Sequence, residues 1–265
     1  MYRLLHNMME IDARINELLQ YLEPITLEQM SGIRLMNRTD TKFVTNKENL
    51  ARLLELAQGK YYAQFCNDSK IANYMTTYWD TDNHRFFLEH HNGRAPRQKV
   101  RVRTYMDSDL TFLEVKIKNN HGRTKKKRVE VPSQEIEVQG ANGEFVEGLV
   151  HQRLNEMHPI VRNQFHRITL VNYDKTERLT IDYDVHFHNM ETGIDANVGP
   201  LVIIELKRDG NVYSPVLDIL RALRIKPSGF SKYCIGSVMT NKKLKQNIFK
   251  EKMIVLSKLA KTRLN

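Results

Sequence analysis

The chain has little cysteine, proline or glycine, and it has no long apolar run. Its 265 residues include 2 cysteines, Cys66 and Cys234, which are too few for a disulfide framework or a zinc finger. The 12 Gly and 7 Pro argue against a disordered or collagen-like chain. No apolar run approaches the ~20 residues that span a bilayer, and the first residues lack the apolar segment of a secretory signal. We therefore expect a folded protein of the reducing cytoplasm.

Basic residues are in clear excess. Lys and Arg number 41 against 31 Asp and Glu, which gives a formal net charge of +10. Such a balance favours an anionic partner, which is a nucleic acid, a nucleotide, a polyphosphate or a lipid surface. The hydrophobic content of 41% is enough for a core, and the length suits one large domain or two small ones.

Apolar periodicity predicts helices at both ends of the chain and strands between them. Spacings of three and four residues predict helices within 1–25 and near 47–58, 83–91, 143–157, 213–223 and 242–262. Two-residue alternation predicts strands near 33–44, 73–79, 98–105, 110–118, 124–131, 164–173, 178–187, 200–207 and 233–239. Short turns connect most of these strands, which favours an antiparallel sheet or barrel.

The predicted strands have one apolar and one charged face, because strand side chains alternate between faces. In 99–103, for example, three cations alternate with two valines. The cations on these charged faces are Arg38, Lys42, Lys99, Arg101, Arg103, Lys116, Lys118, Lys126, Arg128, Arg178 and Lys207. The acids are Asp40, Glu114, Glu130, Asp182, Asp184 and Glu205.

Two interpretations fit this alternation. The first is a sheet whose charged face lies in water and forms salt bridges. The second is a barrel built inside out, with helices on its apolar exterior and cations lining a wet tunnel. Cross-strand pairing would balance the signs, whereas here cations outnumber acids. Close cations repel by roughly 2–4 kcal/mol per pair at an effective dielectric near 20, and a bound polyanion would relieve that cost. Alternation alone leaves both open.

Eight segments occur in an order that is similar to a known family. They are RTDTKF (38–43), YWDTD (78–82), KVRVRTY (99–105), FLEVKIK (112–118), TKKKRV (124–129), RLTIDYD (178–184), IIELK (203–207) and FSKYCIG (230–236). Together they resemble the VTC domain, the polyphosphate polymerase branch of the CYTH-like triphosphate tunnel metalloenzymes. The resemblance implies a single α+β domain over 1–265: an N-terminal helix in 1–25, an eight-stranded antiparallel barrel in 30–240 with helices packed outside, and a basic helix in 242–262.

The resemblance also implies the site residues. Matching positions for triphosphate binding are Lys42, Arg101, Arg103, Lys116, Lys126, Arg178 and Lys232, and Glu205 matches the metal-binding glutamate, with Glu114 as a helper through water. Further substrate contacts are expected at Arg38, Lys99, Lys118, Arg128 and Lys207. Ser231 is either a phosphate contact or a turn residue. The family's Tyr-x-Arg step is assigned to Tyr173-Asp174-Lys175, where lysine keeps the charge but loses the bidentate fork.

The activity implied is transfer of the γ-phosphate of ATP to a growing polyphosphate, with Mn²⁺ or Mg²⁺ as cofactor. The catalytic set would be Lys42, Arg101, Arg103, Lys116, Arg178 and Glu205. The alternative enzyme is an inorganic or nucleoside triphosphatase, but the sequence at 38–42 lacks the acids of the ExExK strand that such hydrolases use to position water. A non-catalytic polyphosphate-binding module is the third possibility. Nucleic acid is not expected, because aromatics do not interleave the basic rows.

Two features remain outside this assignment. Asp182, Asp184, His186 and His188 share one parity, so they either form a row of metal ligands or leave the histidines beyond the wet end of the strand. The last predicted helix is basic and has an apolar line of Leu244, Ile248, Val255 and Leu259. It is expected to pack on the barrel with a solvated basic side, or to contact a membrane surface, a separate membrane protein or an emerging polyanion. The cytoplasmic protein would then lie at the inner face of a membrane.

Overall fold

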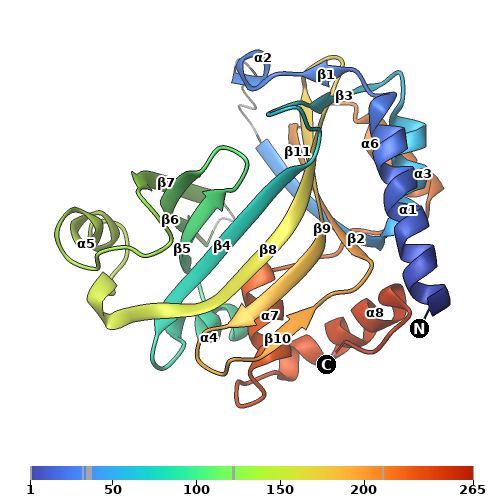
Figure 1. The fold of residues 1–265 in the computed structure, drawn as a ribbon. Coiled ribbons are helices and arrows are strands. Elements are labelled where there is room, and N and C mark those ends of the chain that lie inside the picture. Colours follow the sequence, from blue (N-terminus) through green and yellow to red (C-terminus); the bar gives the residue numbers. More distant parts are fainter. Residues whose placement is uncertain (1, 32, 34–37, 121–122, 211, 265) are drawn as a thin grey trace.

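The computed structural model describes residues 2–31, 33, 38–120, 123–210 and 212–264 (Figure 1). Eight antiparallel strands follow one another in the order β2-β11-β9-β8-β4-β5-β6-β7 and form a curved, barrel-like sheet with β2 and β7 at its ends. These strands are β2 (Arg38–Asn46), β4 (Ala72–Thr81), β5 (Arg97–Tyr105), β6 (Leu110–Lys118), β7 (Thr124–Val131), β8 (Met157–Asn172), β9 (Glu177–Asn189) and β11 (Leu201–Asp209). The α+β fold and the eight-stranded antiparallel path are confirmed.

Short strands and helices complete the fold. The short strands are β1 (Pro24–Ile25), β3 (Tyr61–Gln64) and β10 (Asp195–Asn197). The helices are α1 (Tyr2–Gln20), α2 (Leu27–Ser31), α3 (Lys47–Ala57), α4 (Arg85–His91), α5 (Gly140–Glu147), α6 (Pro215–Ala222), α7 (Lys232–Thr240) and α8 (Lys250–Ala260), with 3-10 turns at Leu154–Glu156 and Asn247–Phe249. No described helix is both long and apolar enough to cross a membrane.

Helices cover the outer face of the sheet. Leu179, Ile181 and Ile204 pack in one core with residues of α1, α3 and α6. Val100 and Val115 pack in another core with Val146 of α5. Because the apolar rows lie against helices, the charged rows lie on the opposite, inner face. The inside-out interpretation of the alternation is therefore the one that the structure adopts.

Segment 233–239, which alternation predicts as a strand, is the helix α7. Every residue of Tyr233–Thr240 is buried, so the helix has no polar stripe from which its 3.6-residue period could be recognised. Ser231 caps it by accepting a hydrogen bond from the Cys234 N–H at 3.3 Å. α7 packs on the inner face at one end of the barrel, where the Tyr233 ring stacks on Tyr78 with centroids 5.2 Å apart.

A β-bulge in β9 separates the wet part of the inner face from the part that α7 covers. Asp184 has a left-handed φ of 50°, and the register of β8 and β9 shifts beside it. Asp184 therefore leaves the inner face and pairs with Lys47 of α3, whose Nζ lies 2.7 Å from Oδ1 and 2.6 Å from Asp12 of α1. Beyond the bulge Phe187 packs with α7, and His186 is exposed. A row of metal ligands from Asp182 to His188, which was one of the two alternatives, does not form, because the bulge breaks the shared parity.

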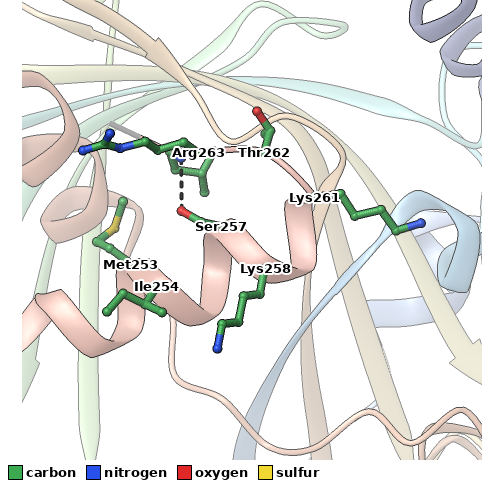
Figure 2. Close-up of a pocket in the computed structure, with 8 residues that line it drawn as sticks. Met253, Ile254, Ser257, Lys258, Lys261, Thr262 and Arg263 are labelled. Carbon is green, nitrogen blue, oxygen red and sulfur yellow. Dashed lines mark hydrogen bonds between the residues drawn. The ribbon is translucent and has the colours of Figure 1, made fainter.

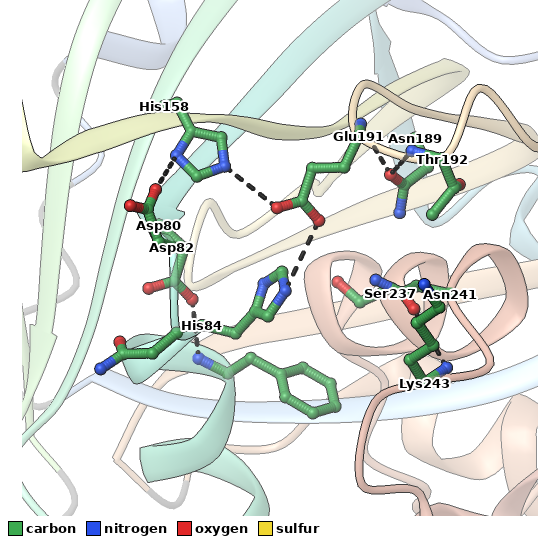
Figure 3. Close-up of polar contacts among 12 residues, drawn as sticks. Asp80, Asp82, His84, His158, Asn189, Glu191, Thr192, Ser237, Asn241 and Lys243 are labelled. Carbon is green, nitrogen blue, oxygen red and sulfur yellow. Dashed lines mark hydrogen bonds and ion pairs between the residues drawn. The ribbon is translucent and has the colours of Figure 1, made fainter.

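Polar contacts brace the end of the barrel beside α7 (Figure 3). The His158 ring lies 3.1 Å from the Asp82 carboxylate and 3.0 Å from that of Glu191, which also lies 3.5 Å from His84. These contacts join the loop after β4, the start of β8 and the turn after β9. Asn189 of β9 donates to the Thr240 hydroxyl at the last turn of α7, at 3.0 Å.

Some predicted boundaries also need correction. The helix predicted at 143–157 covers Gly140–Glu147, and β8 begins at Met157, seven residues before the predicted strand at 164–173. The strand predicted at 33–44 begins at Arg38; residues 34–37 lie outside the described part of the chain. The helix predicted at 242–262 is the shorter α8. Its buried side carries Leu256 and Ala260, while Val255 of the predicted apolar line is half-exposed.

Candidate anion-binding site

Charged side chains from β2, β5, β6, β7, β8, β9 and β11 meet Lys232 of α7 on the inner face. The backbone register places Lys42 opposite Glu205, Lys99 opposite Lys116, Arg101 opposite Glu114, and Lys207 opposite Arg178. α7 begins with Lys232 and follows Ser231, whose hydroxyl accepts a hydrogen bond from Lys99 at 2.9 Å. The fold therefore brings together cations that lie far apart in the sequence.

Glu114 is fully buried and holds two of these cations. Arg101 donates through Nε and Nη2 to Oε2 of Glu114 at 2.7 and 2.5 Å, and Lys126 donates to Oε1. Burial would raise the pKa of Glu114, but Arg101 and Arg103 hold that pKa well below its usual range. Both carboxylate oxygens are engaged by cations, so Glu114 orients Arg101 and Lys126. The helper role in metal binding predicted for Glu114 does not fit this geometry.

Asp182 plays the same part on the other side of the inner face. Arg167 of β8 donates to its two oxygens at 2.6 and 2.8 Å, and Lys232 contacts one of them. Burial would raise the pKa of Asp182, but Arg167 and Lys232 hold it well below its usual range. Burial also lowers the pKa of Lys232 to about 8, against the opposing effect of Asp182. The carboxylate thus fixes two cations near the rings of Tyr74 and Phe165.

Three other cations on the inner face make contacts of a different kind. Arg103 is buried, and its Nε donates to the Thr76 hydroxyl at 3.1 Å. Lys42 donates to the Phe230 carbonyl at 3.1 Å. Repulsion from Arg101, together with burial, holds the pKa of Lys116 well below its ordinary value. Cations that lie close together where water is partly excluded attract a multiply charged anion.

Glu205 is the candidate metal ligand. Lys207 contacts its carboxylate at 3.2 Å, and about a quarter of its side chain is exposed. Burial would raise its pKa, but Lys207, Lys42 and Lys116 hold that pKa well below the usual range, so the carboxylate is ionised. Among the described residues, no three His, Cys, Asp or Glu side chains gather where they could hold a metal ion. A single carboxylate fits Mg²⁺ or Mn²⁺, which take their remaining oxygens from substrate phosphates and water.

Several predicted site residues lie at the edge of this cluster or away from it. Lys118 and Arg128 are exposed, and the Arg128 guanidinium lies over the Phe112 ring at 4.3 Å. Lys175 is exposed in the turn between β8 and β9, with a left-handed φ of 56°. Arg38 opens β2, opposite Asp209, and its side chain lies outside the described part of the chain. The structure does not bring Lys175 into the cluster.

Arg167 was missed by the sequence reasoning. It lies two residues after Phe165 on β8, and both side chains are on the inner face, where Arg167 lies over the Phe165 ring at 5.3 Å. Phe165-His166-Arg167 is therefore an aromatic-x-arginine step in a better position than Tyr173-Asp174-Lys175. The sequence places Arg167 within the strand predicted at 164–173, and its pairing with Asp182 of β9 is what puts it on the inner face.

Solved structures of other proteins share this fold. HpAC1 from Hippeastrum, an adenylyl cyclase candidate with a dominant triphosphatase activity, matches with a TM-score of 0.51 at 14% identity, over 77% of this chain and 96% of that chain. An adenylate cyclase candidate from Bacillus halodurans matches with a TM-score of 0.49 at 15% identity, over 74% of this chain and 96% of that one. At such identities the likeness concerns the fold alone.

The sequence also assigns the chain to a protein family. The model of the VTC domain family matches residues 37–241, which is well over half of the chain. The chain therefore belongs to the VTC domain family, and the resemblance of its eight segments is confirmed. No curated protein matches the sequence.

Proposed function

We propose that this chain is a metal-dependent polyphosphate polymerase that transfers the γ-phosphate of ATP to the end of a polyphosphate chain. The observation that carries the proposal is the set of cations on the inner face that includes Lys42, Arg103 and Lys116. The buried carboxylates of Glu114 and Asp182 bind Arg101 and Arg167 instead. Glu114 and Asp182 hold their arginines in place, so the face keeps positive charge for a row of phosphates.

The chemistry demands positioning rather than a strong base. An oxygen of the terminal acceptor phosphate attacks the γ-phosphorus; one P–O bond forms, the bond to the β–γ bridging oxygen breaks, and ADP leaves. Arg101 and Arg103 are two residues apart on β5, so they hold neighbouring phosphates in line. The acceptor phosphate is already largely ionised. A divalent ion bound to Glu205 and the phosphates would supply charge neutralisation at the β- and γ-oxygens.

A triphosphatase is the competing function, and the triphosphatase activity of HpAC1 favours it. Hydrolysis needs a water positioned in line, and β2 carries Arg38-Thr39-Asp40-Thr41-Lys42 where the hydrolases have an ExExK strand. The supply of acids is therefore poorer than hydrolysis requires, which supports transfer to a phosphate acceptor.

The decisive experiment incubates the purified protein with ATP and Mn²⁺ or Mg²⁺ and resolves the products on a gel. A ladder of polyphosphate with matching ADP supports the polymerase. Orthophosphate with ADP and no ladder identifies the hydrolase, and tripolyphosphate binding without turnover identifies the binding module.

Variants localise the activity. Arg103→Ala and Glu205→Gln should each abolish synthesis while the fold survives. Lys125→Ala is the matched control: Lys125 is exposed on β7 opposite Ile117, which packs with the outer core, so it lies on the other face from Lys126. Full activity in Arg103→Ala or Glu205→Gln would remove that residue from the site.

A further inference from the structure

The α8 surface carries cations and exposed aliphatic side chains together. A hollow of ≈ 550 Å³ lies between α8 and the chain that follows it (Figure 2). Met253, Ile254 and Leu264 supply its apolar lining, and Lys258, Lys261 and Arg263 supply its cations. A second hollow of ≈ 330 Å³ continues from it and adds Lys242 and Lys250. Among the described residues that line these hollows, none is acidic.

α8 has one apolar side that is packed and another that is open. Leu256 and Ala260 are buried against the barrel, together with Phe249 from the preceding turn. On the opposite side Ile254 is 56% exposed, and it lies one helical turn from both Lys250 and Lys258. Val255 and Ile248 are 50% and 53% exposed. The exposed side of Ile254 adds little to the packing of this domain and is open to a partner, with Lys250, Glu251 and Lys258 each within one helical turn.

We propose that this side of α8 binds the surface of a membrane that contains anionic phospholipid. Ile254 and Val255 enter the boundary between headgroups and acyl chains, and Lys250, Lys258 and Lys261 contact lipid phosphates. Apolar insertion and electrostatic attraction would act together in such a contact. The inference does not depend on the reaction proposed for the inner face.

The observations favour lipid over the two other anionic partners that suit a basic surface. A soluble polyphosphate has no apolar part to cover Ile248, Ile254 and Val255. A binding groove for an acidic protein segment would be lined by aliphatic side chains that lie close together. Ile248, Ile254 and Val255 are instead spread over the turn Asn247–Phe249 and α8. A broad surface with scattered lysines and half-exposed isoleucines fits a bilayer better.

On the side that faces the barrel, α8 contacts the loop that leads into the candidate site. Lys252 donates to the carbonyl of Gly229, two residues before Ser231. A membrane-bound α8 would therefore hold the loop that precedes α7 close to the lipid surface, with the inner face still accessible.

The test is sedimentation of the full chain with vesicles of phosphatidylcholine, with and without phosphatidylglycerol. The wild type should sediment with the anionic vesicles only. Ile254→Asp should weaken this binding about tenfold, and Lys258→Glu with Lys261→Glu should weaken it at least as much. Matched controls are Leu110→Asp, at an aliphatic position that is 43% exposed at the start of β6, and Lys125→Glu, at an exposed lysine of β7; both should bind as the wild type does.

Four outcomes would overturn the proposal. They are a wild type that stays in the supernatant with both vesicles, an Ile254→Asp variant that binds fully, controls that lose binding equally, and displacement from vesicles by tripolyphosphate, which would indicate binding through the inner face. Tripolyphosphate affinity of Ile254→Asp should equal that of the wild type, which shows that the variant is folded and keeps this result independent of the polymerase proposal.

Discussion

At the scale of single residues, the two buried carboxylates of the inner face act on protein cations. Glu114 and Asp182 each bind an arginine through two hydrogen bonds and a lysine through another. Neither therefore offers the free oxygens that a metal ion or a general base would need. Their effect is to fix Arg101 and Arg167 on two sides of the inner face, where each repels Arg103.

Glu114→Gln tests this role. Removal of the charge leaves Arg101 and Lys126 without their buried partner, and the loss of one member of a buried ion pair costs about 3–5 kcal/mol. We expect the free energy of unfolding, measured in urea with a chelator present, to fall by about 3 kcal/mol. Glu130→Gln, at an exposed position of β7, is the control and should change it little. Unchanged stability in chelator, with loss of metal-dependent activity alone, would instead make Glu114 a metal ligand.

Lys232 gives a pH dependence with opposite signs for binding and for stability. Burial lowers the pKa of Lys232 to about 8, so the folded protein loses this charge as pH rises through that value. Tripolyphosphate affinity should fall with it. The unfolded chain keeps the proton up to a pKa of about 10.4, so between these values the unfolded state binds more protons and stability rises with pH.

Tyr78 titrates in the same range. Burial would raise its pKa, but Arg101 and Lys99 bring it down to about 8, and a phenolate on the inner face would also weaken anion binding. Calorimetry of tripolyphosphate binding on both sides of pH 8 is the measurement. The combined variant Lys232→Arg, Tyr78→Phe should show a flatter decline than the wild type. An unchanged slope would assign the pH dependence to other groups.

At the scale of elements, the sequence predicted the strands in which charged and apolar residues alternate. It missed α7 and the bulge of β9, which depend on tertiary contacts. The strands at 98–105, 110–118 and 124–131 have a charged and an apolar row, although Lys125 and Lys127 interrupt the apolar row of the third, and the structure has all three within one residue. α7 is buried on all sides, so its apolar run is equally compatible with a strand. The bulge at Asp184 depends on one left-handed φ and on the Lys47 contact, neither of which alternation encodes.

Gly236 shows how tightly α7 is fitted to the barrel. A Cβ at this position would lie 2.5 Å from Cδ1 of Phe187 and 3.0 Å from Cγ1 of Val161. Gly236→Ala should therefore lower the free energy of unfolding by about 2 kcal/mol through overpacking. Tripolyphosphate should also bind more weakly, because α7 begins with Lys232 and a displaced helix would shift that ammonium group.

A second substitution separates overpacking from other causes. Phe187→Leu in the Gly236→Ala background makes room for the methyl group and should recover part of both losses. Gly229→Ala is the control, since its Cβ would meet only the Lys252 Nζ at 3.9 Å. If the double variant is less stable than Gly236→Ala alone, the close approach to Phe187 is not the reason for glycine.

At the scale of the whole molecule, the sequence predicted that the sheet has one apolar and one charged face. It predicted only some of the residues that form the cation cluster on the inner face. Parity alone assigned Lys42, Arg101, Arg103 and Lys116 to one face, and the structure brings them together. It could not show that Lys118 and Arg128 are exposed at the edge, because exposure depends on where the strands end and on what covers them. Arg167 became evident only from the pairing of β8 with β9.

The assembled barrel concentrates like charges, so its stability and its affinity for anions should oppose each other. Lys116→Met removes a cation that Arg101 repels and keeps most of the side-chain volume. We expect the ligand-free variant to be at least as stable as the wild type in thermal unfolding. It should gain less than the wild type from tripolyphosphate, which at 100 times its Kd should stabilise the wild type by about 2.7 kcal/mol. Lys127→Met, at an exposed position of β7, is the control.

Added salt should raise the stability of the ligand-free protein and lower its affinity for tripolyphosphate. Screening of the repulsion on the inner face should raise the unfolding temperature of the ligand-free wild type, while it weakens tripolyphosphate binding, and both effects should be smaller in Lys116→Met. A Lys116→Met protein that melts well below the wild type, yet gains as much from tripolyphosphate, would show that Lys116 stabilises the barrel and takes no part in binding. The cations of the inner face would then need to be assigned afresh, starting from Arg103 and Arg167.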